Sequence, residues 1–370
     1  MKKYKLGDLL SEFHAGKAIQ TENIKNKGAY PVYGGNGQRG YTDSYNQDGE
    51  YLIIGRQGAY CGNVRYNIGK AYLTEHAIVG QTREDHNPIY IALKLSLMKL
   101  SQLQGQSAQP GLSVNTLSCI SMEMPPKEIQ DKIADIMLKL DRKIELNRQI
   151  NDNLEAMAKQ LYDYWFVQFD FPNEEGMPYK SSGGEMVWNE KLKREIPQGW
   201  VVEKMGKCTN VLLGGTPDTN DNSLWGNGYN WLNSGEVAEF PILKSEKNIT
   251  PKGLEKSATV LAPKGSVTLS ITRHLRPSIL CIDACINQSV VAILENDKVS
   301  KEYIYPLLNR DIPRLMSLRT GAQQPHINKE TVEAINVVLP PANIMGAYIN
   351  IAESIYNAIF NNAKDVEELN

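Results

Sequence analysis

One short stretch, GNGQRG at residues 35–40, places its glycines at the spacing of a dinucleotide-binding loop. Such a loop holds a pyrophosphate when a strand precedes it and a helix opens at its last glycine. A strand could end at Tyr33, but the YTDSYNQDGE that follows cannot open a helix. The stretch therefore predicts a glycine-rich hairpin that exposes Asn36, Gln38 and Arg39. A nucleotide-dependent enzyme built on this loop remains an alternative.

No other segment assembles a nucleophile, a base and an orienting group. The sequence contains no GxxxxGK[ST] phosphate loop, no HExxH, no GxSxG and no Asn/Asp-Pro-Pro-aromatic methyltransferase signature. Its five cysteines are scattered without a paired metal spacing, which indicates reduced packing residues. His76 in LTEHAIVG is expected to be a satisfied buried side chain. We therefore expect a chain that performs no chemistry itself and binds no metal or cofactor.

Turns in both halves of the chain instead gather hydrogen-bonding and aromatic side chains. Arginine can pair with guanine O6 and N7, Asn and Gln can pair with adenine N6 and N7, and glycine lets a backbone approach phosphate. Because the same residue types also form ordinary turns, the pattern gains its weight from recurring in both halves. The candidate DNA-contacting residues are Tyr33, Gly35, Asn36, Gln38, Arg39, Arg56, Gln57, Asn63, Arg65, Gln106, Gln109, Thr216, Asn220, Trp231, Asn233, Ser234, Arg273, His274, Arg276, Arg319, Gln323, Gln324 and His326.

The sequence segments that should position these residues occur twice in the chain. Residues 107–129 align without a gap with residues 322–344, and both segments contain a double proline. The two halves begin with a similar short motif, KLG at residues 5–7 and KMG at residues 204–206. Each half then runs through a globular segment and closes with the double proline and a helix. The chain is therefore one unit duplicated rather than a repeat array.

After each double proline, apolar residues recur at spacings of three and four, which predicts a helix with a heptad-like stripe. The first helix should run from Lys127 to Trp165, about 58 Å, and the second from Ala342 to Asn370, about 43 Å. Two asparagines lie in matching places on the stripe, either as polar core positions that fix register or as flank residues exposed to water. The predicted helix-seam residues are Ile133, Ile136, Leu140, Asn147, Leu154, Tyr348, Ile351, Ile355 and Asn362.

The globular segments mix strands and helices. Runs such as EYLIIG, AIVG, SVTLSI and QSVVAIL are strand-like, while residues 88–100 and 300–318 read as helical, with Pro306 and Pro313 expected to kink or divide the second. An α+β domain, twice, is the predicted fold class. The predicted division is a first domain, a long helix, an exposed linker rich in Pro, Gly, Ser and charge, a second domain and a second helix, at residues 1–125, 126–170, 171–195, 196–340 and 341–370.

Charge and hydropathy narrow the class of protein. The net charge is −2, with the helical parts acidic and the globular parts mildly basic. This distribution suits globular parts that meet an anion and helices that meet protein, although an ordinary solvated surface explains it equally well. No apolar run approaches the roughly 18 residues that span a membrane, and the N-terminus has no apolar signal region. We expect a cytoplasmic protein without a membrane partner.

Taken together, these segments resemble the specificity (S) subunits of type I restriction–modification enzymes. In the first half the resemblance rests on YPVYGGNGQRGYTDSY, IGRQGAYCGNV, TEHAIV, and the helix PPKEIQDKIADIMLKLDRKIELNRQINDNLEAMAKQLYDYWFVQF with the PYKSSGGEMVWNEKLKREIPQGW that follows it. In the second half it rests on GGTPDT, WLNSGEV, ACINQSVV and QQPHINKETV with its double proline. The resemblance covers nearly the whole chain.

The resemblance implies two target recognition domains that each read half of a split double-stranded DNA sequence, with two long antiparallel helices as a spacer. It implies two modification (methyltransferase) subunits that carry S-adenosylmethionine and restriction (motor–nuclease) subunits that use ATP and Mg. The second helix departs from the first because it lacks any counterpart of LYDYWFVQF. A protein-binding scaffold with duplicated domains and no DNA role remains the alternative outside this class.

Overall fold

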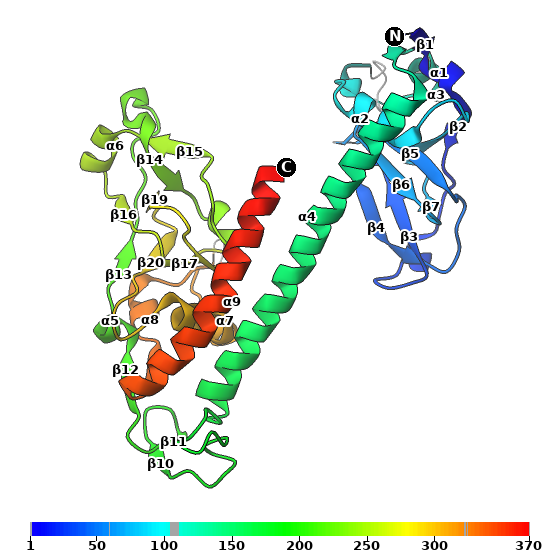
Figure 1. The fold of residues 1–370 in the computed structure, drawn as a ribbon. Helices are drawn as coiled ribbons and strands as arrows, with labels where there is room; N and C mark the ends of the chain where they lie inside the picture. The colour runs from blue at the N-terminus through cyan, green and yellow to red at the C-terminus, as the bar shows by residue number, and fades with distance from the viewer. Residues whose placement is uncertain (1, 59, 104–110, 322, 324, 370) are drawn as a thin grey trace. The chain divides into compact units, whose positions relative to one another are not determined.

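The computed structural model describes residues 2–58, 60–103, 111–321, 323 and 325–369. These residues form two compact units, Met1–Arg142 (unit 1) and Lys143–Asn370 (unit 2), and each is described by itself. Both units combine short strands with helices, as the ribbon shows (Figure 1). The α+β fold class predicted from the sequence is therefore confirmed.

Unit 1 holds the first globular part and the beginning of a long helix. Its elements are β1 (Lys2–Lys5), α1 (Leu6–Leu9), β2 (Leu10–Ala15), β3 (Tyr30–Gly34), β4 (Gly37–Thr42), β5 (Glu50–Gly55), β6 (Val64–Ile68), β7 (Tyr72–Leu73), β8 (Ala77–Thr82), α2 (Pro88–Ser96), α3 (Val114–Ser118), β9 (Ser121–Met124) and α4 (Lys127–Tyr162), which continues into unit 2.

Unit 2 holds the end of α4, a connector and the second globular part. Its further elements are β10 (Met186–Asn189), β11 (Arg194–Pro197), β12 (Val201–Lys204), α5 (Met205–Cys208), β13 (Val211–Leu213), β14 (Trp225–Leu232), β15 (Lys247–Ile249), α6 (Pro251–Glu255), β16 (Val260–Ala262), β17 (Val267–Ser270), β18 (Pro277–Ile279), β19 (Ala284–Ile286), β20 (Val290–Ile293), α7 (Lys301–Ser317), α8 (Lys329–Glu333), β21 (Asn336–Leu339) and α9 (Ala342–Leu369).

The two globular parts have the same strand order. In unit 1 the main antiparallel sheet runs β2-β8-β5-β6, and in unit 2 it runs β13-β20-β17-β18. A second sheet contains the parallel pair β3 and β7 in unit 1 and the parallel pair β14 and β19 in unit 2. The first strand of each part pairs with its last, β1 with β9 and β12 with β21. The duplication seen in the sequence is thus a duplication of topology.

The core strand β5 explains why this sequence makes a sheet that is covered on both faces. Successive side chains of a strand point to opposite faces, so the apolar run EYLIIG supplies both. Leu52 and Ile54 pack in one buried cluster with α2, whereas Tyr51 and Ile53 pack in another. The four strands expected from EYLIIG, AIVG, SVTLSI and QSVVAIL are confirmed as β5, β8, β17 and β20. The helix α7 is continuous through both of its prolines, so they do not divide it, which was one of the two expected outcomes.

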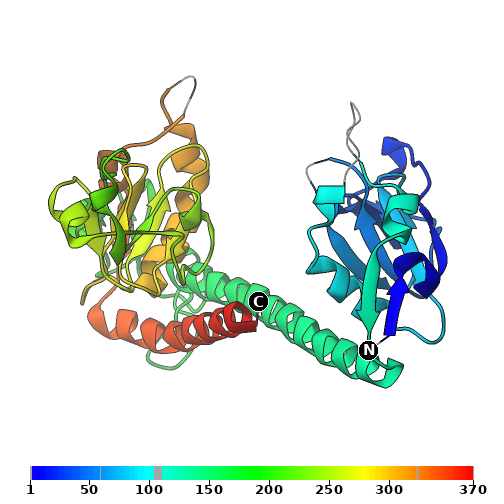
Figure 2. The same cartoon turned by 90° about the horizontal axis from the view of Figure 1, so that it is seen from above.

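Within unit 2, α4 and α9 run antiparallel. The Nδ2 of Asn362 on α9 donates to Oδ1 of Asn151 on α4 at 3.1 Å, and Lys143 forms an ion pair with Asp365 at 3.2 Å. At the other end α4 passes into a π-helical turn, Asp163–Val167, beyond the predicted end at Trp165. Figures 1 and 2 show α9 alongside the later half of α4.

The buried seam of these helices is narrower than the stripe of apolar residues predicts. Tyr348 is fully buried, Asn147 is 8% exposed, and Leu154 and Ile355 pack against the core of unit 2. Three seam predictions are wrong, because the structure exposes Ile133, Ile136 and Ile351. Leu140 and Asn362 are half-buried. A heptad-like spacing makes a stripe along a whole helix, but the stripe is buried only where another element covers it.

We expect Asn147→Leu to raise the free energy of unfolding by about 1 kcal/mol. The side-chain amide Nδ2 of Asn147 is buried and has no hydrogen-bond partner in the described residues, so its desolvation is uncompensated. Denaturant unfolding of the full chain measures the change. Asn362→Leu is the matched control, because it removes a made hydrogen bond to Asn151 and should not stabilise. A lower free energy of unfolding for Asn147→Leu would contradict this assignment.

The segment predicted as an exposed linker, residues 171–195, is mostly exposed, but part of it is folded. Its strand β10 forms a hairpin with β11, with Met186 opposite Pro197. Phe171 belongs to the main core of unit 2 and stacks on Trp200 with ring centroids 5.0 Å apart. The prediction of an exposed segment is therefore right for most of these residues and wrong for the hairpin and Phe171. A single aromatic residue among polar ones hardly changes the local composition, although it can bury a large surface.

We expect Glu155 on α4 to make unit 2 less stable as the pH rises. Burial, followed by the nearby charge of Asp152, raises the pKa of Glu155 to about 7. The folded state therefore holds a proton that the unfolded state releases near pH 4.5, and stability is lost as the pH rises from there through about 7.

Glu155→Gln should remove this loss and leave other pH effects in place. The difference in unfolding free energy between pH 5 and pH 8 should narrow by about 1 kcal/mol, a value discounted for the solvent that reaches this partly exposed carboxyl. Thermal unfolding at the two pH values measures it. Asp152→Asn is a weaker companion change, because it removes only the smaller cause. An unchanged pH profile for Glu155→Gln would refute the raised pKa.

Candidate nucleic-acid interface

The GNGQRG stretch forms a tight hairpin between β3 and β4 in unit 1. Gly37 has φ of 103°, a backbone conformation that side-chain-bearing residues rarely adopt, and a Cβ there would overlap the guanidinium of Arg65. Arg65 projects from β6, and its Nη2 donates to the carbonyl of Asn36 at 3.4 Å. Burial, opposed in part by the charge of Arg65, raises the pKa of Tyr33. The hairpin thus brings Tyr33, Asn36 and Arg65 together.

Two further loops of unit 1 meet this hairpin. A Cβ on Gly35 would lie 3.0 Å from the carbonyl of His76 and 3.2 Å from that of Gln57, so the turn rests directly on both loops. The Nδ1 of His76 lies 3.3 Å from Oε1 of Gln57, and its Nε2 lies 3.3 Å from Oε1 of Glu75. His76 is exposed, which corrects the expectation of a buried histidine. Gln57, Glu75 and His76 thus form one connected group of hydrogen-bond donors and acceptors.

The other described candidates of unit 1 lie on β4 and on the loop after β5. Gln38 and Arg39 are exposed on β4, and the Nε2 of Gln38 donates to the carbonyl of Gly40. The carbonyl of Asn63 accepts from the amide of Gly55 at 2.8 Å. The amide of Arg56 donates to the carbonyl of His76 at 2.9 Å, which fixes the loop that carries Gln57. Gln106 and Gln109 lie outside the described residues.

In unit 2 the corresponding polar cluster lies on two facing loops. Arg273 has φ of 55°, an uncommon value for arginine, and its amide donates to the carbonyl of Pro325 at 3.0 Å. Nη1 of Arg319 donates to the carbonyl of Arg273 at 2.7 Å, so the two arginines lie next to each other. His326 pairs with Thr272 across the loops. His274, Arg276 and Gln323 are exposed on the same loops, and Gln324 lies outside the described residues.

Several candidates of unit 2 instead hold the fold. Trp231 is 6% exposed and donates from Nε1 to the carbonyl of Gly215 at 3.2 Å, so it is not free to stack on a base. Oδ1 of Asn233 accepts from the amide of Gly235 at 2.7 Å and shapes a turn. Asn220 is exposed on a loop where its amide donates to Asp218, and Ser234 is half-buried. Trp231 is therefore corrected from a candidate contact to a structural residue, while Asn233 stays a candidate whose Oδ1 is already used in the turn.

The loops of the two units are held by the same backbone hydrogen bonds. In unit 1 these bonds run from the amide of one residue to the carbonyl of another: Thr74 to Tyr33, Arg56 to His76, Leu112 to Arg56 and Gly16 to Ala77. In unit 2 the equivalent bonds, in the same order, are Asn287 to Leu232, Ile271 to Ser289, Ile327 to Ile271 and Gly214 to Val290. These bonds make Gln57 equivalent to Thr272 and His76 equivalent to Ser289. The scaffold is repeated, while the side chains that it presents differ.

Three residues of these loops, Glu75, Gln288 and Ser289, were not among the candidates from the sequence. Thr216 donates from Oγ1 to Oε1 of Gln288, which occupies the place of Glu75 in unit 1. Oε2 of Glu75 is buried without a hydrogen-bond partner in the described residues. Glu75 lies in the segment TEHAIV, and Gln288 and Ser289 lie in the segment ACINQSVV. The two segments occupy equivalent places in the two halves. That recurrence is the signal that could have identified them.

Other kinds of site find little support in the described part of the chain. No group of three or more His, Cys, Asp or Glu side chains there could hold a metal ion. None of the helices searched is long and apolar enough to cross a membrane. The polar loop clusters of the two units are thus the candidate site that the geometry presents.

Comparison with known proteins identifies relatives of this chain. A family model described as "Type I restriction modification DNA specificity domain" matches residues 1–156 and 197–368. The EcoprrI specificity subunit of Escherichia coli is 41% identical over 144 residues, which cover 38% of this chain and 36% of that subunit. The MjaIX specificity subunit of Methanocaldococcus jannaschii is 23% identical over 355 residues, which cover 88% of this chain and 80% of that subunit.

A solved structure shows the same fold. The crystal structure of the type I restriction–modification S subunit from M. genitalium superposes with a TM-score of 0.63 and 14% sequence identity. The match covers 100% of this chain and 92% of that chain. At this identity the likeness concerns the fold alone.

Proposed function

The chain belongs to the type I restriction–modification DNA specificity family, and from this premise we propose that its two globular parts read the two halves of one split DNA target. It is a specificity subunit, the non-catalytic component that recognises DNA in a complex with other restriction–modification subunits. The finer assignment to half-sites rests on the equivalent hydrogen bonds of the two units. A repeated frame that presents Gln57 and His76 in one unit and Thr272 and Ser289 in the other suits two half-sites of different sequence.

We further propose that α4 and α9 separate the half-sites and set the length of the unread gap. Two modification subunits, which carry S-adenosylmethionine, and restriction subunits, which use ATP and Mg, complete the proposed complex. Exposed apolar side chains on α4 support a contact with partner protein: Ile129, Ile150 and Met157 are each about half exposed. In this proposal the chain itself recognises the DNA sequence, and the cofactors are bound by its partners.

One matched pair of variants tests the assignment of half-sites. Arg65→Gln in unit 1 and Arg273→Asn in unit 2 each remove a cation from one loop cluster, and Asn tolerates the left-handed backbone of residue 273. Each variant should weaken binding of the target duplex about tenfold, because a good bidentate contact to a base is worth about 1–3 kcal/mol. The target is obtained by methylome sequencing, and affinity is measured in the assembled methyltransferase complex across a salt series.

Duplexes altered in one half-site complete the test. Arg65→Gln should make the complex indifferent to changes in one half, and Arg273→Asn should make it indifferent to changes in the other. Lys139→Gln, an exposed change on α4, is the control and should alter neither. Loss of discrimination in the same half for both variants would refute separate reading. Binding with no salt dependence in any complex would favour the scaffold alternative.

A further inference from the structure

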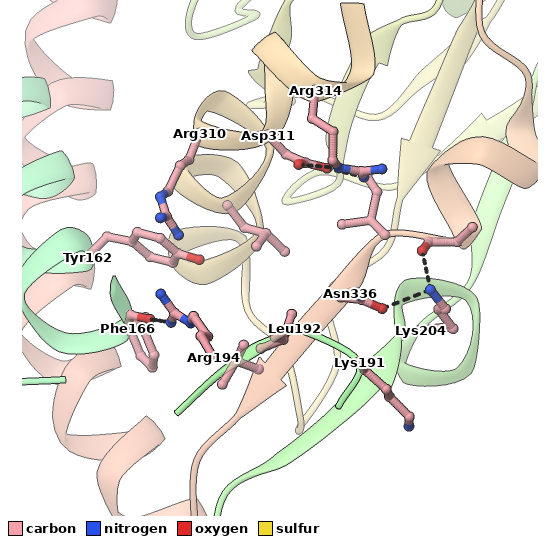
Figure 3. A pocket seen from close by; sticks show the side chains of 14 residues that line it. Tyr162, Phe166, Lys191, Leu192, Arg194, Lys204, Arg310, Asp311, Arg314 and Asn336 are labelled. Atoms are coloured by element: carbon pink, nitrogen blue, oxygen red, sulfur yellow. Dashed lines mark hydrogen bonds and ion pairs between the residues drawn. The ribbon is translucent and has the colours of Figure 1, made fainter. Parts of the chain in front are cut away.

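A pocket of about 460 Å³ opens in unit 2 where the end of α4, the connector and α7 meet. Among its described lining residues five are basic, Lys191, Arg194, Lys204, Arg310 and Arg314, and Asp311 is acidic. Figure 3 shows the guanidinium groups of Arg194 and Arg310 both turned toward Tyr162. The pocket is therefore cationic, and its cations come from three different segments of the chain.

Some of this positive charge is already satisfied inside the protein. Arg314 donates from Nε to Oδ1 of Asp311 at 2.7 Å and forms an ion pair with the same carboxylate. Lys204 donates from Nζ to the carbonyl of Ala334 and to Oδ1 of Asn336, at 2.9 and 2.8 Å (Figure 3). Lys191 donates to the carbonyl of Val202 at 2.7 Å and has Glu203 at 3.9 Å. These three side chains are committed to internal partners.

Arg194 and Arg310 differ from the other cations. No carboxylate of the described residues lies within ion-pair distance of either guanidinium. Nη2 of Arg194 donates to the carbonyl of Phe166 at 3.2 Å, and its Cζ lies 4.5 Å from the ring centroid of Phe169, so its position is fixed. Burial, followed by the charge of Arg310, lowers the pKa of Arg194. The half-buried Arg194 and the exposed Arg310 are thus two like charges that repel each other, an arrangement that an anion between them would relieve.

The rest of the lining indicates what kind of anion fits. Leu192 is half-buried in the lining and supplies the accessible apolar surface, whereas Phe166 and Leu307 are buried behind it. A phosphodiester has no apolar body to cover such a surface, whereas a peptide places an apolar side chain beside a carboxylate. None of the candidate DNA-contacting residues lines the pocket.

We propose that this pocket binds an acidic peptide segment of a partner protein, with a carboxylate on Arg194 and Arg310 and a neighbouring apolar side chain against Leu192. Guanidinium groups suit a carboxylate because their N–H donors match its two oxygens. The proposal stands independently of how the loop clusters read DNA. It adds to this chain a peptide site at the joint between the end of α4 and the second globular part.

The test uses the full chain and two capped peptides, Ac-Leu-Glu-Leu-Glu-NH₂ and Ac-Leu-Gln-Leu-Gln-NH₂, measured by calorimetric titration at low salt. The acidic peptide should bind at least tenfold more tightly than its amide counterpart. Arg310→Gln should abolish that preference, while Lys139→Gln, a remote exposed change, should leave it intact. Arg310 is exposed, and its removal relieves repulsion with Arg194, so the melting temperature of the free variant should stay level or rise.

Three results would overturn the proposal. Equal binding of both peptides would show that no carboxylate is recognised. An unchanged preference in Arg310→Gln would place the peptide elsewhere. Displacement of the peptide by a short DNA duplex or by inorganic phosphate at equal concentration, lost in Arg310→Gln, would make the pocket a phosphate site rather than a peptide site.

Discussion

Exchanging residues 201–339 for the corresponding part of another specificity subunit should change one half of the DNA target completely and leave the other half and the gap unchanged. The cut points follow from the structure. Val201 on β12 lies opposite Leu339 on β21, so the exchanged part begins and ends on one antiparallel strand pair. Because each unit contains its own sheets and loops, the first half should still be read by unit 1.

The exchange must preserve the contacts that join the second globular part to α4. Tyr303 packs edge-on against Phe166 with centroids 4.8 Å apart and donates to the carbonyl of Val338 at 2.7 Å. We would therefore retain Tyr303 in the exchanged segment. Methylome sequencing of cells that carry the hybrid gives the result, and the reciprocal exchange of residues 2–124 is the control that should alter the opposite half. A hybrid in which both halves change would refute modular reading.

Phe166→Ala should lower the free energy of unfolding of unit 2 by about 3–5 kcal/mol, the range for deleting a buried phenylalanine. Phe166 is 2% exposed and lies at the centre of a cluster of rings. Its ring centroid is 4.8 Å from those of Tyr303 and Tyr348 and 5.8 Å from that of Trp200. These partners belong to α7, to α9 and to the segment after β11, so one side chain joins three parts of the unit to the end of α4.

Denaturant unfolding of the full chain measures this loss, and limited proteolysis of the segment between α4 and β12 should accelerate with it. Trp188→Ala is the control, since Trp188 is 58% exposed on β10 and a surface change of this kind usually costs under about 0.5 kcal/mol. A change below about 1 kcal/mol for Phe166→Ala would show that the ring cluster does not hold the joint together.

The sequence by itself determined the architecture. The repeat at residues 107–129 and 322–344 was enough to predict two equivalent globular parts, because a duplicated segment repeats its hydrophobic period and turn residues and so its topology. The same holds for β5 and β20, whose apolar runs are long enough to be read locally. The hairpin at residues 35–40 was predictable for the same reason: glycine and turn chemistry act over a few residues.

Only the tertiary structure decided which side chains are available. Trp231 and Asn233 have the types and positions of contact residues, yet one is buried and the other shapes a turn. His76 shows the reverse case, because it looks like a core residue in sequence and stands exposed beside Gln57. Exposure depends on which distant segment covers a residue, and a local pattern does not carry that information.

The same reason explains the helices and the connector. The apolar stripe of α4 is continuous in sequence, but its burial depends on where α9 lies against it, and so Asn147 is buried while Ile136 is exposed. In the connector, Phe171 packs with Trp165 at the end of the first long helix, with Tyr179 and with Trp200, and all of these residues belong to or pack against the core of unit 2. Local periodicity therefore specifies elements and their repetition, and packing between distant segments decides the seam, the connector and the cationic pocket between Arg194 and Arg310.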